Sequence, residues 1–335
     1  MATSIMTSFR VGAVALAVAS SWAAPRSDAA AAIGCEGRSL ITELSAKSPA
    51  RLASLLASAS EQENSHAVLW RIEKSSQQPS FILGTLHLAH QSLQELSPAI
   101  RSAIASARVV ALEQAQLSRG AYGQVMAQAG KLMSARDKPL QRLLDESELK
   151  VVEKAISAAG YPEDLALGIR PWVATLFLAG GCSEVTQDPM DLIVANMAKA
   201  QGKQVVGLET LLEQYETLAA IPDDSQAAWL RASIEMHDRV DDVTVTMLEL
   251  YRDRKIAASL DLMQELAPGA GLTEARMHDI RNGLITDRNR RLAERSLPLL
   301  EAGGAFVAIG AAHLPGSVGV ISILKRGGFT VTPVE

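Results

Sequence analysis

Two segments near opposite ends of the chain share one pattern: an apolar strand, a glycine, two small or apolar residues, and then His-Leu. Residues 81–88 read FILGTLHL and residues 307–314 read VAIGAAHL. The histidines of the two segments, His87 and His313, are expected just beyond the carboxyl ends of their strands, where ligands of α/β sheets bind. If the two strands are neighbours, both imidazoles converge on one centre.

Strand and helix patterns alternate at the two ends of the chain, and the part between them is mainly helical. Strands are predicted at 68–73 and 80–83 (a hairpin), 108–113, 203–208 (buried), 306–309 and 329–334. Helices are predicted at 39–59, after 93, within 122–180, and at 189–201, 225–265 (one long helix or a pair), 273–301 and 318–325. The order predicts an α/β fold: a central mixed sheet built from N- and C-terminal strands, flanked by helices, with a large helical insertion.

Composition narrows the class of protein. Of the 335 residues, 48% are hydrophobic, which excludes a largely disordered chain. There are 32 basic and 37 acidic residues, for a net charge of −5, and they are spread along the chain. A mildly acidic protein without a basic stripe is not expected to bind nucleic acid.

The N-terminus has the composition of a targeting segment. Arg10 precedes an almost unbroken apolar run at 11–19, which small residues continue. This run is shorter than the roughly 20 residues that span a bilayer, so we predict a signal peptide at 1–30, cleaved within about 24–32. No later segment is apolar for long enough to form a membrane span, and the mature protein is expected to be periplasmic or secreted.

The two cysteines, Cys35 and Cys182, lie far apart and outside any C-x-x-C motif, which disfavours a thiolate zinc site. In an oxidising compartment the simplest expectation is one disulfide between them, and the alternative is two separate buried thiols. A lipoprotein with Cys35 as the lipidated residue is disfavoured, because charged residues stand between the apolar run and that cysteine.

A carboxylate follows the same pattern as the two histidines. Glu113 ends the predicted strand 108–113, and Glu209 follows strand 203–208, although Thr210 beside it is a helix-capping residue and favours a structural role for Glu209. Two histidines and one carboxylate are the minimum for an open divalent-metal site, which suits hydrolysis. Without metal, the same side chains can act as general base and acid.

Several common catalytic motifs are missing from the sequence. It contains no H-E-x-x-H, no G-x-S-x-G, no G-x-x-x-x-G-K-[ST] and no G-x-G-x-x-G after a strand. The standard zincin, serine-hydrolase, P-loop and dinucleotide-binding interpretations therefore have no support.

The ordered set of motifs resembles the TraB/GumN family from about Ala67 to Val334. The motifs are Trp70, Phe81 to His87, Leu112-Glu113, Arg170-Pro171-Trp172, Asp191, Gly207 to Thr210, Gln214, Arg288-Asn289 and Gly310 to Gly316. The resemblance implies an α/β fold similar to the erythromycin-esterase/ChaN-like group. It places the family domain at 67–335, after an N-terminal helical extension at 31–66.

The resemblance also implies a chemistry. Animal Tiki members of the family are described as proteases that depend on manganese or cobalt and act on secreted signalling proteins. By position, His87, His313 and Glu113 inherit the metal-binding and catalytic roles, with zinc as another candidate metal. Arg288 and Arg170 are further catalytic candidates, either binding a substrate oxygen through the guanidinium or only pairing with Asp191 and Glu209.

We therefore expect an exported metal-dependent hydrolase, most consistent with a peptidase acting on a peptide or protein. Two alternatives stay open: a non-catalytic periplasmic protein that binds or sequesters a peptide signal or serves polysaccharide assembly, and a metal-free esterase-like hydrolase.

Overall fold

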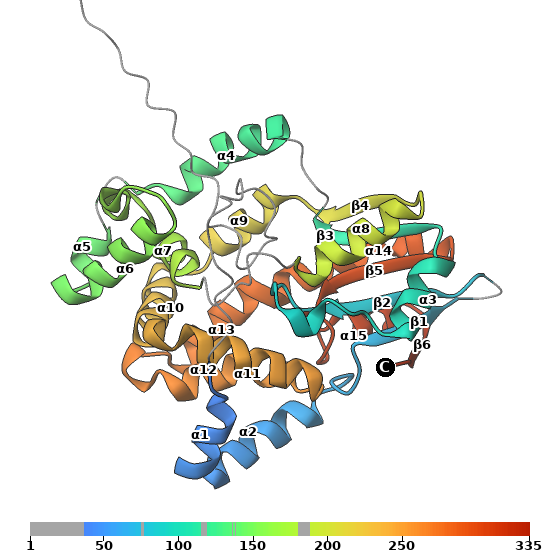
Figure 1. The fold of residues 1–335 in the computed structure, drawn as a ribbon, viewed down its shortest axis with the longest axis horizontal. Coiled ribbons are helices and arrows are strands. Elements are labelled where there is room, and N and C mark those ends of the chain that lie inside the picture. The colour runs from blue at the N-terminus through green and yellow to red at the C-terminus, as the bar shows by residue number, and fades with distance from the viewer. Residues whose placement is uncertain (1–36, 75–76, 115–118, 136, 138, 180–187) are drawn as a thin grey trace, which may run out of the picture.

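Six strands form one mixed sheet in the order β4-β3-β5-β2-β1-β6 (Figure 1). The computed structural model describes residues 37–74, 77–114, 119–135, 137, 139–179 and 188–335. The strands are β1 (Leu69–Glu73), β2 (Ser80–Thr85), β3 (Val109–Gln114), β4 (Gln204–Glu209), β5 (Ala305–Gly310) and β6 (Thr330–Pro333). The predicted α/β fold, with a mixed sheet built from both ends of the chain, is confirmed.

The two strands that carry the repeated pattern are neighbours. Strands β2 and β5 are parallel, with Gly84 opposite Ile309 and Thr85 opposite Gly310. Strand β3 is parallel to β5 on its other side, and β1 is antiparallel to both β2 and β6. The carboxyl ends of β2, β5 and β3 therefore lie side by side at one edge of the sheet.

Fifteen α-helices are found in the described residues. They are α1 (Leu40–Lys47), α2 (Pro49–Glu61), α3 (Pro98–Ser106), α4 (Arg119–Met133), α5 (Pro139–Leu143), α6 (Glu146–Ala158), α7 (Pro171–Leu178), α8 (Met190–Ala200), α9 (Leu211–Ala219), α10 (Asp223–Glu235), α11 (Val240–Arg252), α12 (Ser259–Leu266), α13 (Glu274–Arg281), α14 (Asp287–Glu301) and α15 (Val320–Arg326). Helices α4 to α7 and α9, α10 and α13 form a helical part beside the sheet (Figure 1).

Two predicted helices are divided in the structure. The helix expected at 39–59 is α1 followed by α2, because Pro49 cannot continue a helix but suits the first position of a new one. The segment 225–265, expected to be one helix or a pair, contains the three helices α10, α11 and α12. Helix α11 ends where Arg254 takes a left-handed conformation with φ 60°.

Alternating side chains of the strands form two cores on the two faces of the sheet. Leu83, Leu112 and Ala308 pack with α3, α8 and α11 on one face. Ile82 and Val307 pack with α14 and α15 on the other face. The helical part has a third core of its own.

The prediction that strand 203–208 is buried is wrong for most of β4. The sequence suggested a buried strand, but Gln204 and Gly207 are exposed and only the end of the strand, Leu208-Glu209, is buried. The reason is position, since β4 is the outermost strand on its side of the sheet and pairs only with β3.

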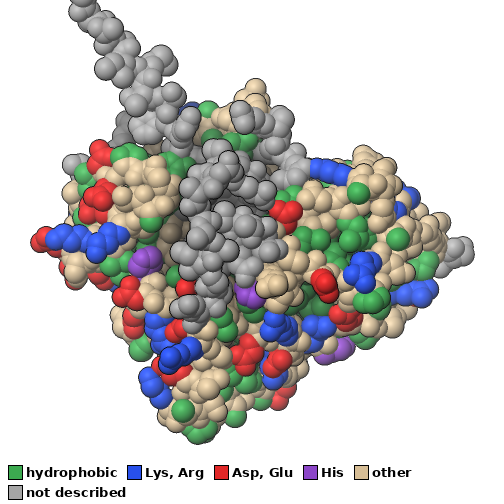
Figure 2. Space-filling model, viewed as in Figure 1, with side chains coloured by type: hydrophobic (Ala, Val, Ile, Leu, Met, Phe, Trp, Pro, Cys, Tyr) green, Lys and Arg blue, Asp and Glu red, His purple; other side chains and the backbone are tan. Residues whose placement is uncertain are grey.

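The predicted signal peptide at 1–30, Cys35 and Cys182 lie outside the described residues. Within the described ranges, no helix is both long enough and apolar enough to cross a membrane. Acidic and basic side chains are interspersed over the face shown in Figure 2.

Candidate active site

His87, Glu113 and His313 meet at the carboxyl edge of the sheet. His87 follows β2, Glu113 belongs to β3, and His313 lies in a 3-10 turn directly after β5. The Oε1 atom of Glu113 is 3.6 Å from Nε2 of His87 and also 3.6 Å from Nε2 of His313. The structure thus brings together the three side chains that the sequence singled out, through three adjacent strands.

The other ring nitrogen of His87 is held by a carboxylate. Its Nδ1 is 2.6 Å from Oδ2 of Asp191, at the start of α8, and Thr85 donates a hydrogen bond of 2.8 Å to Oδ1 of the same residue. Because a carboxylate only accepts, Nδ1 of His87 carries the proton. In the neutral form of the ring, the lone pair is therefore on Nε2 and faces Glu113.

His313 is oriented in the same way by an amide. Its Nδ1 is 2.7 Å from Oδ1 of Asn289, and Nδ2 of Asn289 donates to the carbonyl oxygen of Val318 at 2.9 Å. This second bond fixes the orientation of the amide, so its oxygen accepts from Nδ1–H of His313. The lone pair on Nε2 again points toward Glu113.

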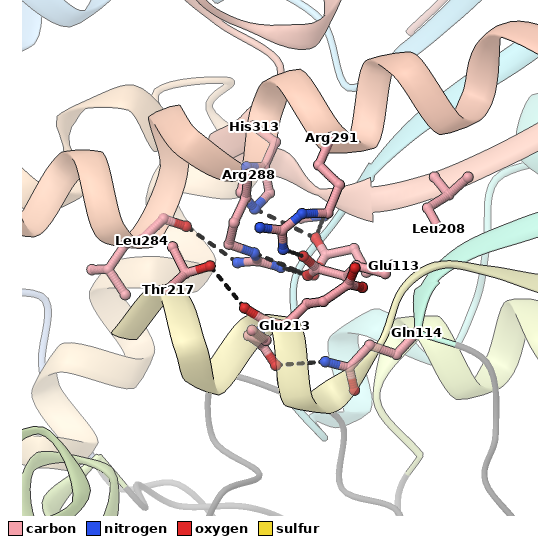
Figure 3. A network of polar contacts seen from close by, with 12 residues as sticks. Glu113, Gln114, Leu208, Glu213, Thr217, Leu284, Arg288, Arg291 and His313 are labelled. Carbon is pink, nitrogen blue, oxygen red and sulfur yellow. Dashed lines mark hydrogen bonds and ion pairs between the residues drawn. The ribbon is translucent and has the colours of Figure 1, made fainter. Parts of the chain in front are cut away.

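Arg288 connects two buried carboxylates (Figure 3). Its Nη2 is 2.6 Å from Oε2 of Glu113, and its Nε donates to Oε1 of Glu209 at 2.9 Å. The side chain of Arg288 is only 4% exposed, and Arg291 pairs with the second oxygen of Glu209 at 3.2 Å. Of the roles left open by the sequence, the structure gives Arg288 the pairing role, with Glu209 and Glu113 rather than Asp191.

A π-helical turn at Asn282–Thr286 supplies a backbone carbonyl to the same place. The carbonyl of Leu284 accepts a hydrogen bond from Nη1 of Arg288 at 3.2 Å. Such turns break the regular helical pairing and are frequent at functional sites. Gly283 permits this one, since a Cβ there would lie 2.4 Å from Cγ1 of Ile221.

Gly310 leaves room in the middle of the centre. Its backbone N–H donates to Oε1 of Glu113 at 2.5 Å. A Cβ at this position would lie 3.0 Å from Nε2 of His87, 3.1 Å from Oε1 of Glu113 and 3.5 Å from Cδ2 of His313. A side chain is therefore absent at the point on which the three groups converge.

The pKa values of the two histidines are shifted in opposite directions. Burial alone lowers the pKa of His87, but Asp191 and Glu113 outweigh it and raise that pKa well above 6.5. For His313, burial lowers the pKa to about 3, and the positive charge of Arg288 adds to this effect. Without a bound metal, His87 is thus the protonated imidazole and His313 the neutral one.

The two buried glutamates differ as well. Burial opposes ionisation of Glu113, but Arg288 and His87 reverse this and hold the pKa of Glu113 well below its usual value. Burial raises the pKa of Glu209, against the opposing charge of Arg288. Glu113 is therefore the ionised carboxylate that faces both histidines.

The fit of a divalent metal rests on donor chemistry. Among the residues that the structure describes, no three His, Cys, Asp or Glu side chains are already arranged as a metal-holding group. Nε2 of His87 and Oε1 of Glu113 nevertheless lie beside the space that Gly310 leaves, and Nε2 of His313 is 3.6 Å from the same Oε1. Both Nδ1 atoms are held by acceptors, as is usual for metal-ligating histidines. The side chains present are thus of the right kind for such a metal.

Arg170 lies elsewhere. It precedes α7 in the helical part, and no hydrogen bond or ion pair in the described structure joins it to His87, Glu113, His313 or Arg288. Its charge acts on Asp137, whose pKa is lowered mainly by a hydrogen bond from Arg142 and to a lesser degree by Arg170. A catalytic role for Arg170 stays a prediction.

Sequence reasoning did not include Asp191, Asn289 and Gly310 among the site residues. The first two were noted only as landmarks of the family resemblance, and Gly310 only as a glycine of the second G-x-x-H. A signal did exist for Asn289, which directly follows Arg288. Asp191 approaches His87 only through the packing of α8 on the sheet, and no local pattern indicates that contact.

The comparisons with known proteins extend over the same part of the chain. The model described as the TraB/PrgY/gumN family matches residues 68–333, a range that includes both G-x-x-H segments and Glu113. No curated protein and no solved structure matches the chain.

Proposed function

The chain belongs to the TraB/PrgY/gumN family, and from that premise we propose that it is an exported metal-dependent hydrolase that acts on peptides. The observation that supports this is the convergence of Nε2 of His87 and Nε2 of His313 on Oε1 of Glu113, beside Gly310. Manganese or cobalt is the proposed metal, with zinc as the alternative. Export rests on the predicted signal peptide at 1–30.

His87 and His313 would hold the metal through Nε2, and Glu113 would either bind it through Oε1 or take up a proton from the attacking water. A bound divalent metal would lower the pKa of water and polarise the carbonyl of the substrate. Asp191 and Asn289 keep both rings in the tautomer that leaves Nε2 unprotonated. Three acidic side chains are buried around the site (Glu113, Asp191 and Glu209), against one buried arginine, Arg288. This excess of negative charge favours a metal cation in place of the proton on Nε2 of His87.

Arg288 acts in this scheme through Glu113. Its guanidinium fixes Oε2, so that Oε1 alone is turned toward the histidines. It also keeps Glu113 ionised in a buried setting, which a ligand or a general base requires. Because Arg288 is saturated by Glu113, Glu209 and a backbone carbonyl, we assign it positioning rather than direct binding of substrate.

A metal-free hydrolase is the second candidate, and the opposite pKa shifts of the two histidines favour it. At neutral pH these shifts keep one ring protonated and the other neutral. His87 would protonate the leaving group and would be reprotonated by the attacking water, which Nε2 of the neutral His313 would orient. Glu113 would hold both rings in place.

A hydrolysis assay separates these candidates. Protein without residues 1–30 is stripped with EDTA, supplied with manganese, cobalt or zinc, and incubated with a library of quenched fluorescent peptides. The proposal expects turnover that needs added metal and is lost in His87→Ala and in His313→Ala, while His278→Ala, which removes an exposed histidine, remains active. EDTA-resistant turnover lost in the same variants supports the metal-free reaction. Peptide binding without any turnover supports a binding protein.

A further inference from the structure

A cavity of about 420 Å³ is lined by two residues that adjoin His313. Asn289, which accepts the hydrogen bond from Nδ1 of His313, lines it, as does the adjacent Ala312. The segment Pro315 to Val318, which follows β5, forms another side. The cavity therefore lies beyond the carboxyl end of β5, where ligands of open α/β sheets bind.

Apolar side chains from separate elements form much of its wall. Ile256 and Leu260 contribute from the chain around α12, Ile285 from the π-helical turn, and Val318 from the loop after β5. The volume is within the range of small-ligand pockets, which are mainly apolar with a few polar groups.

The charged groups at the cavity are already paired within the protein. Arg281 Nη2 lies 2.6 Å from Oδ1 of Asp261, and Glu63 Oε2 accepts a hydrogen bond of 2.9 Å from Ser322. A charged ligand would have to compete with these pairs, whereas an apolar side chain would not. The lining thus favours an uncharged occupant.

Val318 adds an independent observation. Its side chain is 51% exposed, and among the described residues only Val334 is a comparably exposed large hydrophobic. Because an aliphatic side chain exposed at a cavity is stabilised when a ligand covers it, Val318 extends the apolar wall toward solvent.

We propose that this cavity is the subsite for an apolar side chain of the peptide substrate, such as that of Leu or Phe. The assignment rests on the proposed peptide hydrolase and specifies which peptides it takes. Asn289 belongs both to the cavity wall and to the support of His313, so an occupant lies next to the proposed centre.

The test measures binding separately from turnover. Fluorescein-labelled five-residue peptides, with four serines around a central Leu, Phe, Ser or Lys, are titrated with protein that holds no added metal, and anisotropy is recorded. Ala257→Trp and Ser317→Trp each fill the cavity from a different wall and lie outside the proposed centre. Val245→Trp is the matched control, because it fills a second cavity of about 380 Å³ that lies beside His90.

Wild type and Val245→Trp are expected to bind the Leu and Phe peptides at least ~10-fold more tightly than the Ser and Lys peptides. Ala257→Trp or Ser317→Trp, whichever folds as wild type by circular dichroism, is expected to lose that preference. Equal binding of all four peptides by wild type overturns the subsite, and so does a preference that survives in the folded Trp variants. If the preference is lost as expected but wild type hydrolyses no peptide with any metal, the subsite stands and the hydrolase proposal fails.

Discussion

Nη2 of Arg288 lies 2.6 Å from Oε2 of Glu113, and this contact joins a helix to the strand that faces both G-x-x-H histidines. The same guanidinium binds Glu209 at the end of the neighbouring strand β4. Two strand-end carboxylates therefore share one buried cation. The electrostatics of the site depend on this arrangement, because burial alone would favour the neutral form of both acids.

Arg288→Met is expected to lower the free energy of unfolding by about 3–5 kcal/mol, since it removes the arginine from buried Glu113 and leaves buried Glu209 with only Arg291. Chemical denaturation measures this loss. The matched control is Arg290→Met on the same helix, which removes an exposed arginine and is expected to change stability by less than about 0.5 kcal/mol. Equal stability of the two variants would show that Arg288 does not neutralise Glu113 and Glu209.

Gly310→Ala is expected to abolish metal binding and activity while the protein stays folded. The new Cβ would occupy the space between His87 and Glu113, at 3.0 and 3.1 Å from their polar atoms, and the backbone φ of −54° tolerates alanine. Crowding of this kind costs about 1–3 kcal/mol of stability. Metal affinity and melting temperature are measured beside Gly130→Ala, a helical glycine with open space around it, which is expected to be active and slightly more stable. An active Gly310→Ala enzyme is incompatible with a metal at this point.

Asp191→Asn tests whether the carboxylate of Asp191 orients the ring of His87 and keeps the proton on its Nδ1. The amide can present its NH₂ group to Nδ1, which favours the tautomer with the proton on Nε2, where the metal is proposed to bind. Metal affinity or activity is expected to fall about 10–100-fold, with little change in fold. Titration calorimetry and peptide turnover measure the effect, and Asp223→Asn, at the exposed start of α10, is the control. Wild-type affinity in Asp191→Asn would mean that Asp191 does not orient the ring.

The opposite pKa shifts of His87 and His313 predict opposite effects of pH on the free energy of unfolding of the metal-free protein. The pKa of His313 is about 3 in the folded protein against 6.5 for a free histidine, so below pH 6.5 the unfolded chain takes up a proton that the folded one does not. Stability is then lost as the pH falls from 6.5 toward 3, by up to about 1.4 kcal/mol per pH unit. His87 has a raised pKa, so its contribution is fully present below pH 6.5 and is lost as the pH rises through its folded value.

Urea denaturation over about pH 4.5 to 8.5 measures these effects as differences between wild type and variants. His313→Gln is expected to remove the part of the acid-side loss that belongs to His313, and His87→Gln the loss on the alkaline side. His278→Gln, which changes an exposed histidine, keeps the wild-type profile. Parallel profiles of all four proteins would contradict the assignment of charge to the two rings.

The sheet and the proximity of His87, Glu113 and His313 were predictable from the sequence, because both follow from local patterns of strand and loop residues. The apolar strands of the two G-x-x-H segments and the strand before Glu113 are short, strongly apolar and bounded by glycine or charge, and parallel neighbours place their ends together. The exposure of β4 was not predictable in this way. An apolar run such as Val205-Val206 occurs both in central strands and in edge strands. Whether its side chains are buried depends on the strand order, which the sequence pattern does not contain.

The partners of the site residues are long-range contacts, which no local pattern reveals. Arg288 had two open roles in the sequence, and the pairing with Glu209 follows from how α14 packs against β4. The same holds for Asp191 on His87, which depends on the position of α8 over the sheet. Local sequence patterns predict which side chains lie at the end of a strand. Which residues those side chains contact depends on how the helices pack against the sheet.

Titration calorimetry of manganese into the EDTA-stripped protein, repeated with cobalt and zinc, tests the central claim most directly. The wild type is expected to bind about one ion per chain, and the His87→Ala/His313→Ala double variant, folded by circular dichroism, is expected to bind none. Absence of binding by the wild type for all three metals, or the same stoichiometry in the folded double variant, would contradict a metal centre at His87, His313 and Glu113.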